Sequence, residues 1–91
     1  MAIVKKYVVV KFLEEFDEEG KPVVDLVARR WLSGARMDAN GQQLWNCAYP
    51  PKPFLNFISM VKSQMEPGLT WKESVSVILG SSGKFNHFPI L

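Results

Sequence analysis

The valine-rich stretch at residues 5–14 constrains the fold more than any other part of the sequence. Its β-branched and aromatic residues favour extended backbone, so the stretch predicts a strand. Because side chains alternate along a strand, Val8 and Phe12 share one face, while Val9 and Leu13 share the other. Both faces are therefore apolar, and a single flat layer cannot bury both of them. Either the sheet curls on itself or a partner covers it.

A polar turn follows at residues 16–21, in which Gly20 is free to adopt a positive φ. Pro22 then opens a second apolar run at residues 23–32, and proline is tolerated there because the hydrogen-bond ladder has not begun. Two strands joined by this turn predict a β-hairpin. The acidic residues between positions 14 and 19 form a solvated tip or a grip for a basic peptide, and both interpretations stay open.

The rest of the chain alternates between extended and helical patterns. Residues 33–43 are expected to form a loop, since they contain two turn dipeptides. A third strand is predicted at residues 44–49, and it ends at three prolines because they lack the N–H that a ladder needs. Apolar residues recur at helical spacing over residues 54–65, which predicts an α-helix. Period two returns at residues 71–79 as a fourth strand, and residues 80–84 are expected to form a loop.

The predicted order is strand, strand, strand, helix, strand, which indicates the α+β class. We expect a single small domain over residues 1–91, since this length suits one domain and leaves no room for two. The simplest packing is a small antiparallel sheet curled toward a barrel, with one α-helix between strands 3 and 4. The C-terminal residues 85–91 are apolar and fit neither pattern clearly.

Composition bounds the setting of the protein. The formal net charge is only +2, from eleven basic and nine acidic residues, which is weak evidence for any polyanionic partner. The lone Cys47 cannot form an internal disulfide, which favours a reducing, intracellular compartment. No apolar run approaches the roughly 20 residues that span a bilayer, and the N-terminus does not resemble a signal peptide. We therefore expect no membrane partner.

The usual catalytic patterns are incomplete. The segment 80–84 resembles a phosphate-binding loop, but Ile78 replaces its first glycine and Phe85 replaces its final hydroxyl residue. Cys47 and His87 form a nucleophile and base on paper, although a buried structural thiol is the favoured interpretation. One histidine and one cysteine do not make a metal-ligand set. We therefore expect no enzyme, no cofactor, no metal and no small-molecule substrate.

Several short motifs carry a resemblance that covers most of the chain. They are YVVVKFLEE, VVDLVARRWL, LWNCAYPP and WKESVSVILGSSGKF. Together they resemble the small N-terminal module of insect transposon-associated proteins that carry a C-terminal domain of unknown function. The pattern also echoes Tudor-like and chromo-like barrels of chromatin proteins. The resemblance implies an SH3/Tudor-like partial barrel in a nuclear protein that is linked to chromatin or transposons.

Two sets of side chains are candidate binding residues. The aromatic set lies at strand positions or strand ends, and it consists of Trp31, Trp45, Tyr49 and Trp71. In Tudor-like barrels such a set cages a methylated lysine or arginine by cation–π attraction, although in a domain this small it can also be core. The basic set lies close in sequence or across the hairpin, and it consists of Arg29, Arg30, Arg36 and Lys21. It can contact phosphates or remain solvated.

These observations predict a non-enzymatic protein-interaction module in a chromatin- or transposon-associated protein. The partner is another protein or a second copy of the chain, since the first two strands are apolar on both faces. The alternative is a nucleic-acid-binding module that uses the basic set.

Overall fold

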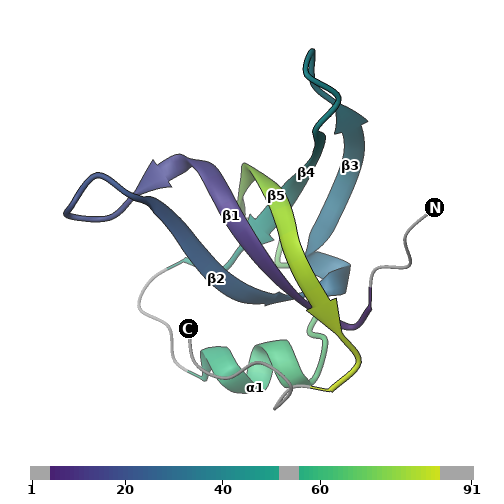
Figure 1. Ribbon diagram of the computed structural model, residues 1–91. Helices are drawn as coiled ribbons and strands as arrows, with labels where there is room; N and C mark the ends of the chain where they lie inside the picture. Colours follow the sequence, from purple (N-terminus) through teal and green to yellow (C-terminus); the bar gives the residue numbers. More distant parts are fainter. Residues whose placement is uncertain (1–4, 52–55, 85–91) are drawn as a thin grey trace.

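A computed structural model describes residues 5–51 and 56–84 of the chain (Figure 1). Its first two strands form the predicted hairpin, in which β1 (Tyr7–Phe16) pairs antiparallel with β2 (Pro22–Ala28). The carboxylate of Asp17 closes the turn, because its Oδ1 accepts the backbone N–H groups of Glu19 and Lys21 at 2.9 Å each. Gly20 adopts the predicted positive φ of 80°.

A second hairpin corrects the prediction for residues 23–43. The second strand ends at Ala28, and a single 3₁₀ turn, η1 (Arg29–Trp31), redirects the chain. The residues expected as a loop then form β3 (Leu32–Met37), which pairs with β4 (Gln43–Tyr49). The sequence did not indicate this break, because residues 23–32 are mostly apolar and favour one continuous strand. The backbone N–H of Arg29 donates to the carbonyl of Lys6, which fixes the point where the chain turns.

The helix lies between the fourth and fifth strands, and not between strands 3 and 4 as predicted. It is α1 (Phe57–Lys62), and the fifth strand is β5 (Lys72–Ser82). The unforeseen β3 accounts for the shift in numbering. The helix stops before Met65 because Gln64 adopts a left-handed φ of 54°. The strand β5 runs through Gly80, where a loop was expected, because β1 is long enough to pair with it as far as Ser82.

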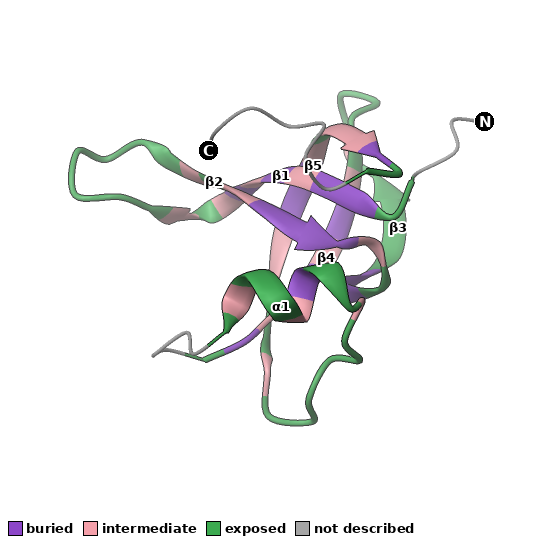
Figure 2. Ribbon diagram, turned by 90° about the horizontal axis from the view of Figure 1, so that it is seen from below, coloured by how far each residue is buried: buried purple, intermediate pink, exposed green. Residues whose placement is uncertain are grey.

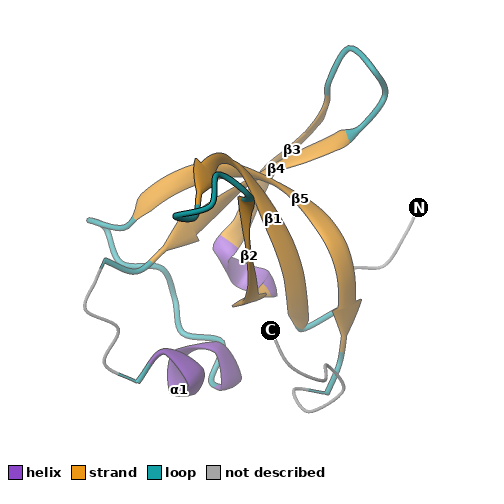
Figure 3. Ribbon diagram, turned by 60° about the vertical axis from the view of Figure 1, so that its left-hand side comes forward, coloured by secondary structure: helices purple, strands orange, loops and turns teal. Residues whose placement is uncertain are grey.

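All five strands join in one antiparallel sheet with the order β2-β1-β5-β4-β3. The sheet curls strongly, and its two hairpins project in different directions (Figures 1 and 3). The edge strands β2 and β3 are joined through η1 but do not pair, so the curl is not closed into a barrel. Within residues 5–51 and 56–84, the prediction of a small curled antiparallel sheet with one α-helix is therefore confirmed.

The core forms on the inner face of this curl. Val8, Val10 and Phe12 alternate along β1 and are 0–3% exposed, as the period-two pattern predicts. From α1, Val61 is fully buried and joins the same cluster. Buried segments of β1, β2 and β4 therefore gather where the sheet and the helix approach each other (Figure 2). Curling thus buries one apolar face of β1 within the chain itself.

Gly34 is the position in β3 where a side chain is expected to be costly. Its φ is +63°, and a Cβ atom there would lie 2.9 Å from Nδ2 of Asn46. We expect Gly34→Ala to lower the free energy of unfolding by about 1–2 kcal/mol, measured by urea denaturation. Gly80→Ala is the matched control, because nothing lies within 4 Å of its Cβ position and its φ is not positive. Equal losses in the two variants would contradict the assigned strain.

Candidate functional site

The predicted aromatic residues Trp31, Tyr49 and Trp71 do come together. The Trp31 ring packs edge-to-face against Trp71, with centroids 5.1 Å apart, and against Tyr49 at 6.4 Å. Phe57 of α1 adds a further edge contact to Trp31 at 5.8 Å. Residues of η1, β4 and α1 thus share one aromatic cluster with Trp71, which immediately precedes β5. Such edge-to-face pairs stabilise a core beyond the area that they bury.

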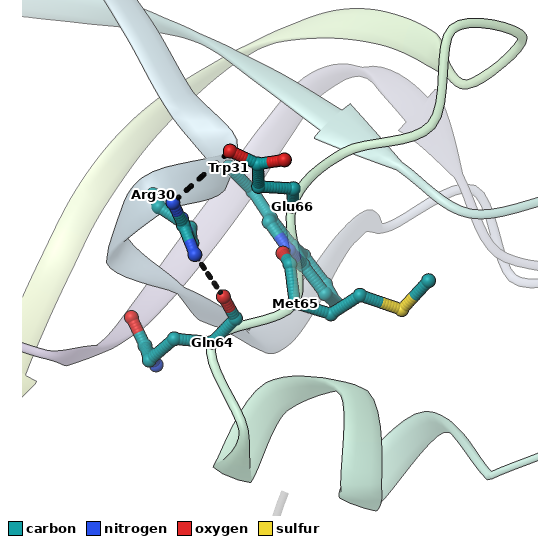
Figure 4. Close-up of polar contacts among 5 residues, drawn as sticks. All are labelled: Arg30, Trp31, Gln64, Met65 and Glu66. Atoms are coloured by element: carbon teal, nitrogen blue, oxygen red, sulfur yellow. Dashed lines mark hydrogen bonds and ion pairs between the residues drawn. The ribbon is translucent and has the colours of Figure 1, made fainter.

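Trp31 is a structural member of this cluster. It is only 1% exposed, and its Nε1–H donates to the carbonyl of Met65 at 2.7 Å. Its neighbour Arg30 donates to the carbonyl of Gln64 at 2.8 Å and reaches the carboxylate of Glu66 (Figure 4). The η1 turn therefore holds the segment that follows α1. A cage for a methylated cation needs an accessible ring face, and this ring has none to offer.

Trp45 lies apart from the cluster, on β4. It is 9% exposed, and the Arg29 guanidinium sits 5.0 Å from its ring centroid. Arg29 also donates to the carbonyl of Leu32. This cation–π contact lies within the chain. The Trp45 ring, a candidate for binding a ligand's cation, therefore already contacts Arg29.

The basic set does not form one patch. Lys21 lies in the turn of the β1–β2 hairpin beside Glu19, whereas Arg36 lies on β3 at the opposite edge of the sheet. Arg36 donates to the Gly34 carbonyl and to Oδ1 of Asn46. Arg29 and Arg30 are engaged as described above. The four cations are therefore divided among three places, the first hairpin turn, η1 and β3.

A groove that the sequence did not reveal opens at one end of the curled sheet. It has a volume of about 580 Å³ and lies where β1 and β4 end and where β2 and β5 begin. We call it the end groove. Its apolar and aromatic lining consists of Phe12, Phe16, Val23, Tyr49, Pro50 and Pro51. Its polar lining consists of Glu15, Asp25, Thr70, Lys72 and Ser74.

Two carboxylates from neighbouring strands face this groove. Asp25 of β2 accepts a hydrogen bond from the Tyr49 hydroxyl, and its Oδ1 accepts the backbone N–H of Leu26 at 2.8 Å. Glu15 of β1 lies 3.2 Å from the Lys72 ammonium, and the Ser74 hydroxyl donates to it at 3.2 Å. Hydrogen bonds from neighbouring residues therefore hold both carboxylates in place.

The ring of Tyr49 links the groove to the core. It packs edge-to-face on Phe12, with centroids 5.4 Å apart, and contacts Phe57 at 5.5 Å. Burial, followed by the hydrogen bond to Asp25, raises the pKa of the Tyr49 hydroxyl. The hydroxyl therefore keeps its proton and acts as a fixed donor that orients the Asp25 carboxylate.

Of the predicted site residues only Tyr49 lines the end groove. Two features of the sequence contribute residues to this groove, but nothing in the sequence indicates that they lie together. One is the acidic run that contains Glu15 next to Phe16, and the other is the Tyr49-Pro50-Pro51 sequence. They lie about 35 positions apart along the chain. Only the order of strands in the sheet brings them to the same end.

Of the two catalytic candidates, the structure describes Cys47. Burial, then the charges of Asp25 and Glu73, raises the pKa of the Cys47 thiol to about 12, so it stays protonated at neutral pH. His87 lies outside the described residues. Over residues 5–51 and 56–84, no group of three metal-binding side chains lies together, and no helix has the length and apolarity to cross a bilayer.

The fold and groove define a small curled β-sheet domain with an acidic, aromatic groove at its open end. No protein family, curated protein or solved structure that was compared with the chain matches it.

Proposed function

We propose that the chain is a non-enzymatic protein-interaction module of the SH3/Tudor-like kind, and that a segment of a partner protein binds in the end groove. The observation that carries this proposal is the groove itself, with its aromatic and proline walls and two carboxylates. Phe16 at its rim is 59% exposed, an unusual exposure for a large aromatic ring. Aromatic-lined surfaces of this type accept extended peptide segments.

The same geometry argues against nucleic acid as the groove's ligand. Glu15 and Asp25 repel phosphates, and the four basic residues that favoured nucleic acid are divided among the first hairpin turn, η1 and β3. The groove volume also lies in the range of small-ligand sites, but the exposed Phe16 rim favours a chain that lies across it. The resemblance to nuclear modules makes chromatin proteins, whose tails are long and extended, the first partners to consider.

A peptide-library selection tests this proposal. We expect the protein to retain a subset of immobilised 12-residue peptides, because the groove presents both apolar and polar contacts. Thr70→Trp places a bulky ring in the groove wall and is expected to weaken the retained peptides about tenfold or more in calorimetry, the equivalent of roughly 1.4 kcal/mol. Gln42→Trp is the matched control, since Gln42 is exposed in the β3–β4 turn, at the other hairpin.

Equal loss of binding in both tryptophan variants, or retention of no peptide at all, would refute the proposal. A parallel titration with duplex DNA at two salt concentrations addresses the alternative function. Tight binding that weakens steeply with salt would favour the nucleic-acid hypothesis instead. Sedimentation of the same samples shows whether a second copy of the chain competes for the groove.

A further inference from the structure

Three charged side chains line the end groove: the two acids and one lysine, Lys72. Glu15 and Asp25 come from adjacent strands, and both line the same groove. The cation that the chain itself supplies is the Lys72 ammonium, 3.2 Å from Glu15. This side chain is 78% exposed, so the groove already holds a positive group in a loose, solvated contact. Exposed pairs of this kind contribute little and exchange readily.

We propose that the end groove receives an arginine or lysine side chain of the partner segment, and that Lys72 is a built-in competitor for Glu15. This inference rests on the proposed function. The charged group of the incoming side chain lies between Glu15 and Asp25. Its aliphatic stem packs on the Phe12 and Tyr49 side of the groove. Lys72 swings away into solvent when the partner's cation takes its place.

The donors that hold Asp25 leave room for this ligand. A carboxylate offers about four acceptor positions. Asp25 uses its Oδ2 for Tyr49 and its Oδ1 for Leu26, one donor to each oxygen. A guanidinium or an ammonium can therefore add a charge-assisted bond without displacing either donor.

The ring of Tyr49 adds a second source of attraction for a cation. Tyr49 is half-buried and lines the groove, where its hydroxyl bonds Asp25, whereas the Phe12 ring that packs on it is 3% exposed and belongs to the core. A cation near an aromatic face is attracted by the ring quadrupole, and the attraction grows when water is excluded. A partner's cation gains these contacts together with the rest of its segment. The ammonium of Lys72, the first residue of β5, pairs with Glu15 at 3.2 Å.

Four synthetic 12-residue peptide libraries test the inference. They carry Arg, Lys, Gln or Glu at a fixed central position and mixed residues elsewhere. We expect retention of the Arg and Lys libraries well above the Gln and Glu libraries. For the best Arg peptide, replacing its central residue with Gln is expected to weaken binding about tenfold or more, because one charge-assisted contact is lost.

Protein variants then assign the contact to the groove. Glu15→Gln and Asp25→Asn are each expected to weaken the Arg peptide about tenfold, whereas Lys72→Gln is expected to strengthen it by about threefold. Glu19→Gln is the matched control, since this acid is 74% exposed in the hairpin turn and should change binding less than twofold. Urea denaturation of each variant shows whether it is folded. If Asp25→Asn does not fold, Glu15→Gln alone tests the contact with the partner's cation.

The possible outcomes separate this inference from the function on which it rests. Retention of all four libraries to a similar extent, with sensitivity to Thr70→Trp, would leave the interaction module standing and overturn the cation. Unchanged or weaker binding by Lys72→Gln would overturn the competitor role. Retention of no library would overturn the interaction module and the cation together.

Discussion

Trp31→Ala is expected to remove about 4 kcal/mol from the free energy of unfolding, the largest loss that we predict for a single substitution. The side chain is 1% exposed and packs against three aromatic rings. Its truncation leaves a cavity at the centre of the aromatic cluster and orphans the Met65 carbonyl. Domains of this size have only about 5–15 kcal/mol in total, so the variant is expected to be partly unfolded at 37 °C.

Urea denaturation followed by circular dichroism measures this loss. Trp31→Phe separates packing from hydrogen bonding, because it keeps an aromatic ring and removes only the Nε1–H donor and part of the volume. We expect it to cost about half as much as the alanine variant. Leu69→Ala is the control, since Leu69 is fully exposed and should change stability by less than about 0.5 kcal/mol. A loss below about 1.5 kcal/mol for Trp31→Ala would mean that the cluster is peripheral.

Local sequence signals predicted the elements that local chemistry decides. Alternation placed Val8 and Phe12 on one face, which the structure buries, and the acidic turn with Gly20 joined the first two strands. The break at Arg29 was missed because no proline or glycine marks it. It is made by a long-range hydrogen bond to Lys6 and by the burial of Trp31, which are tertiary effects that override propensity. The strand β3 was missed for the same reason, and the helix was therefore placed between the wrong strands.

The candidate site shows the same difference between what local sequence predicts and what tertiary contacts decide. Aromatic residues stand out in a sequence, and three of the four chosen do cluster, yet Trp31 faces the interior of the fold. Asp25 was never singled out, because a lone acid inside an apolar run carries no local signal. Its place in the end groove follows from the register that sets Asp25 opposite Val10 and from the order β2-β1-β5-β4. Site geometry therefore depends on pairing that composition does not encode.

Cys47 is expected to make the fold sensitive to alkali. Its side chain is fully buried in β4, and burial, followed by the charges of Asp25 and Glu73, raises its pKa from 9.0 to about 12. Above pH 9 the unfolded chain releases the thiol proton, whereas the folded chain keeps it. The unfolded state therefore gains stability as the pH rises. The contribution of Cys47 is complete below pH 9 and is lost progressively between pH 9 and 12.

The size of this effect follows from the shift. Each pH unit inside this window costs about 1.4 kcal/mol, so the free energy of unfolding should fall by about 2 kcal/mol between pH 8.5 and 10.5 because of Cys47 alone. Urea denaturation across this range in the native chain and in Cys47→Ala measures it. The alanine variant starts lower because it leaves a small cavity, but its dependence on pH should be shallower by that amount.

Tyr49 changes this comparison little, because the main causes of its raised pKa, burial and the hydrogen bond to Asp25, are present in both proteins, and only the smallest cause, the charge of Cys47, is absent from Cys47→Ala. The thiol's reactivity gives an independent check. A thiol reagent should modify the folded chain at pH 9 only as fast as the chain opens, since a buried protonated sulfur is inert. Parallel pH dependences in the two proteins, or rapid modification of the folded chain, would place Cys47 in contact with water. The β4–β5 packing that buries it would then be looser than the register of Cys47 opposite Ser74 implies.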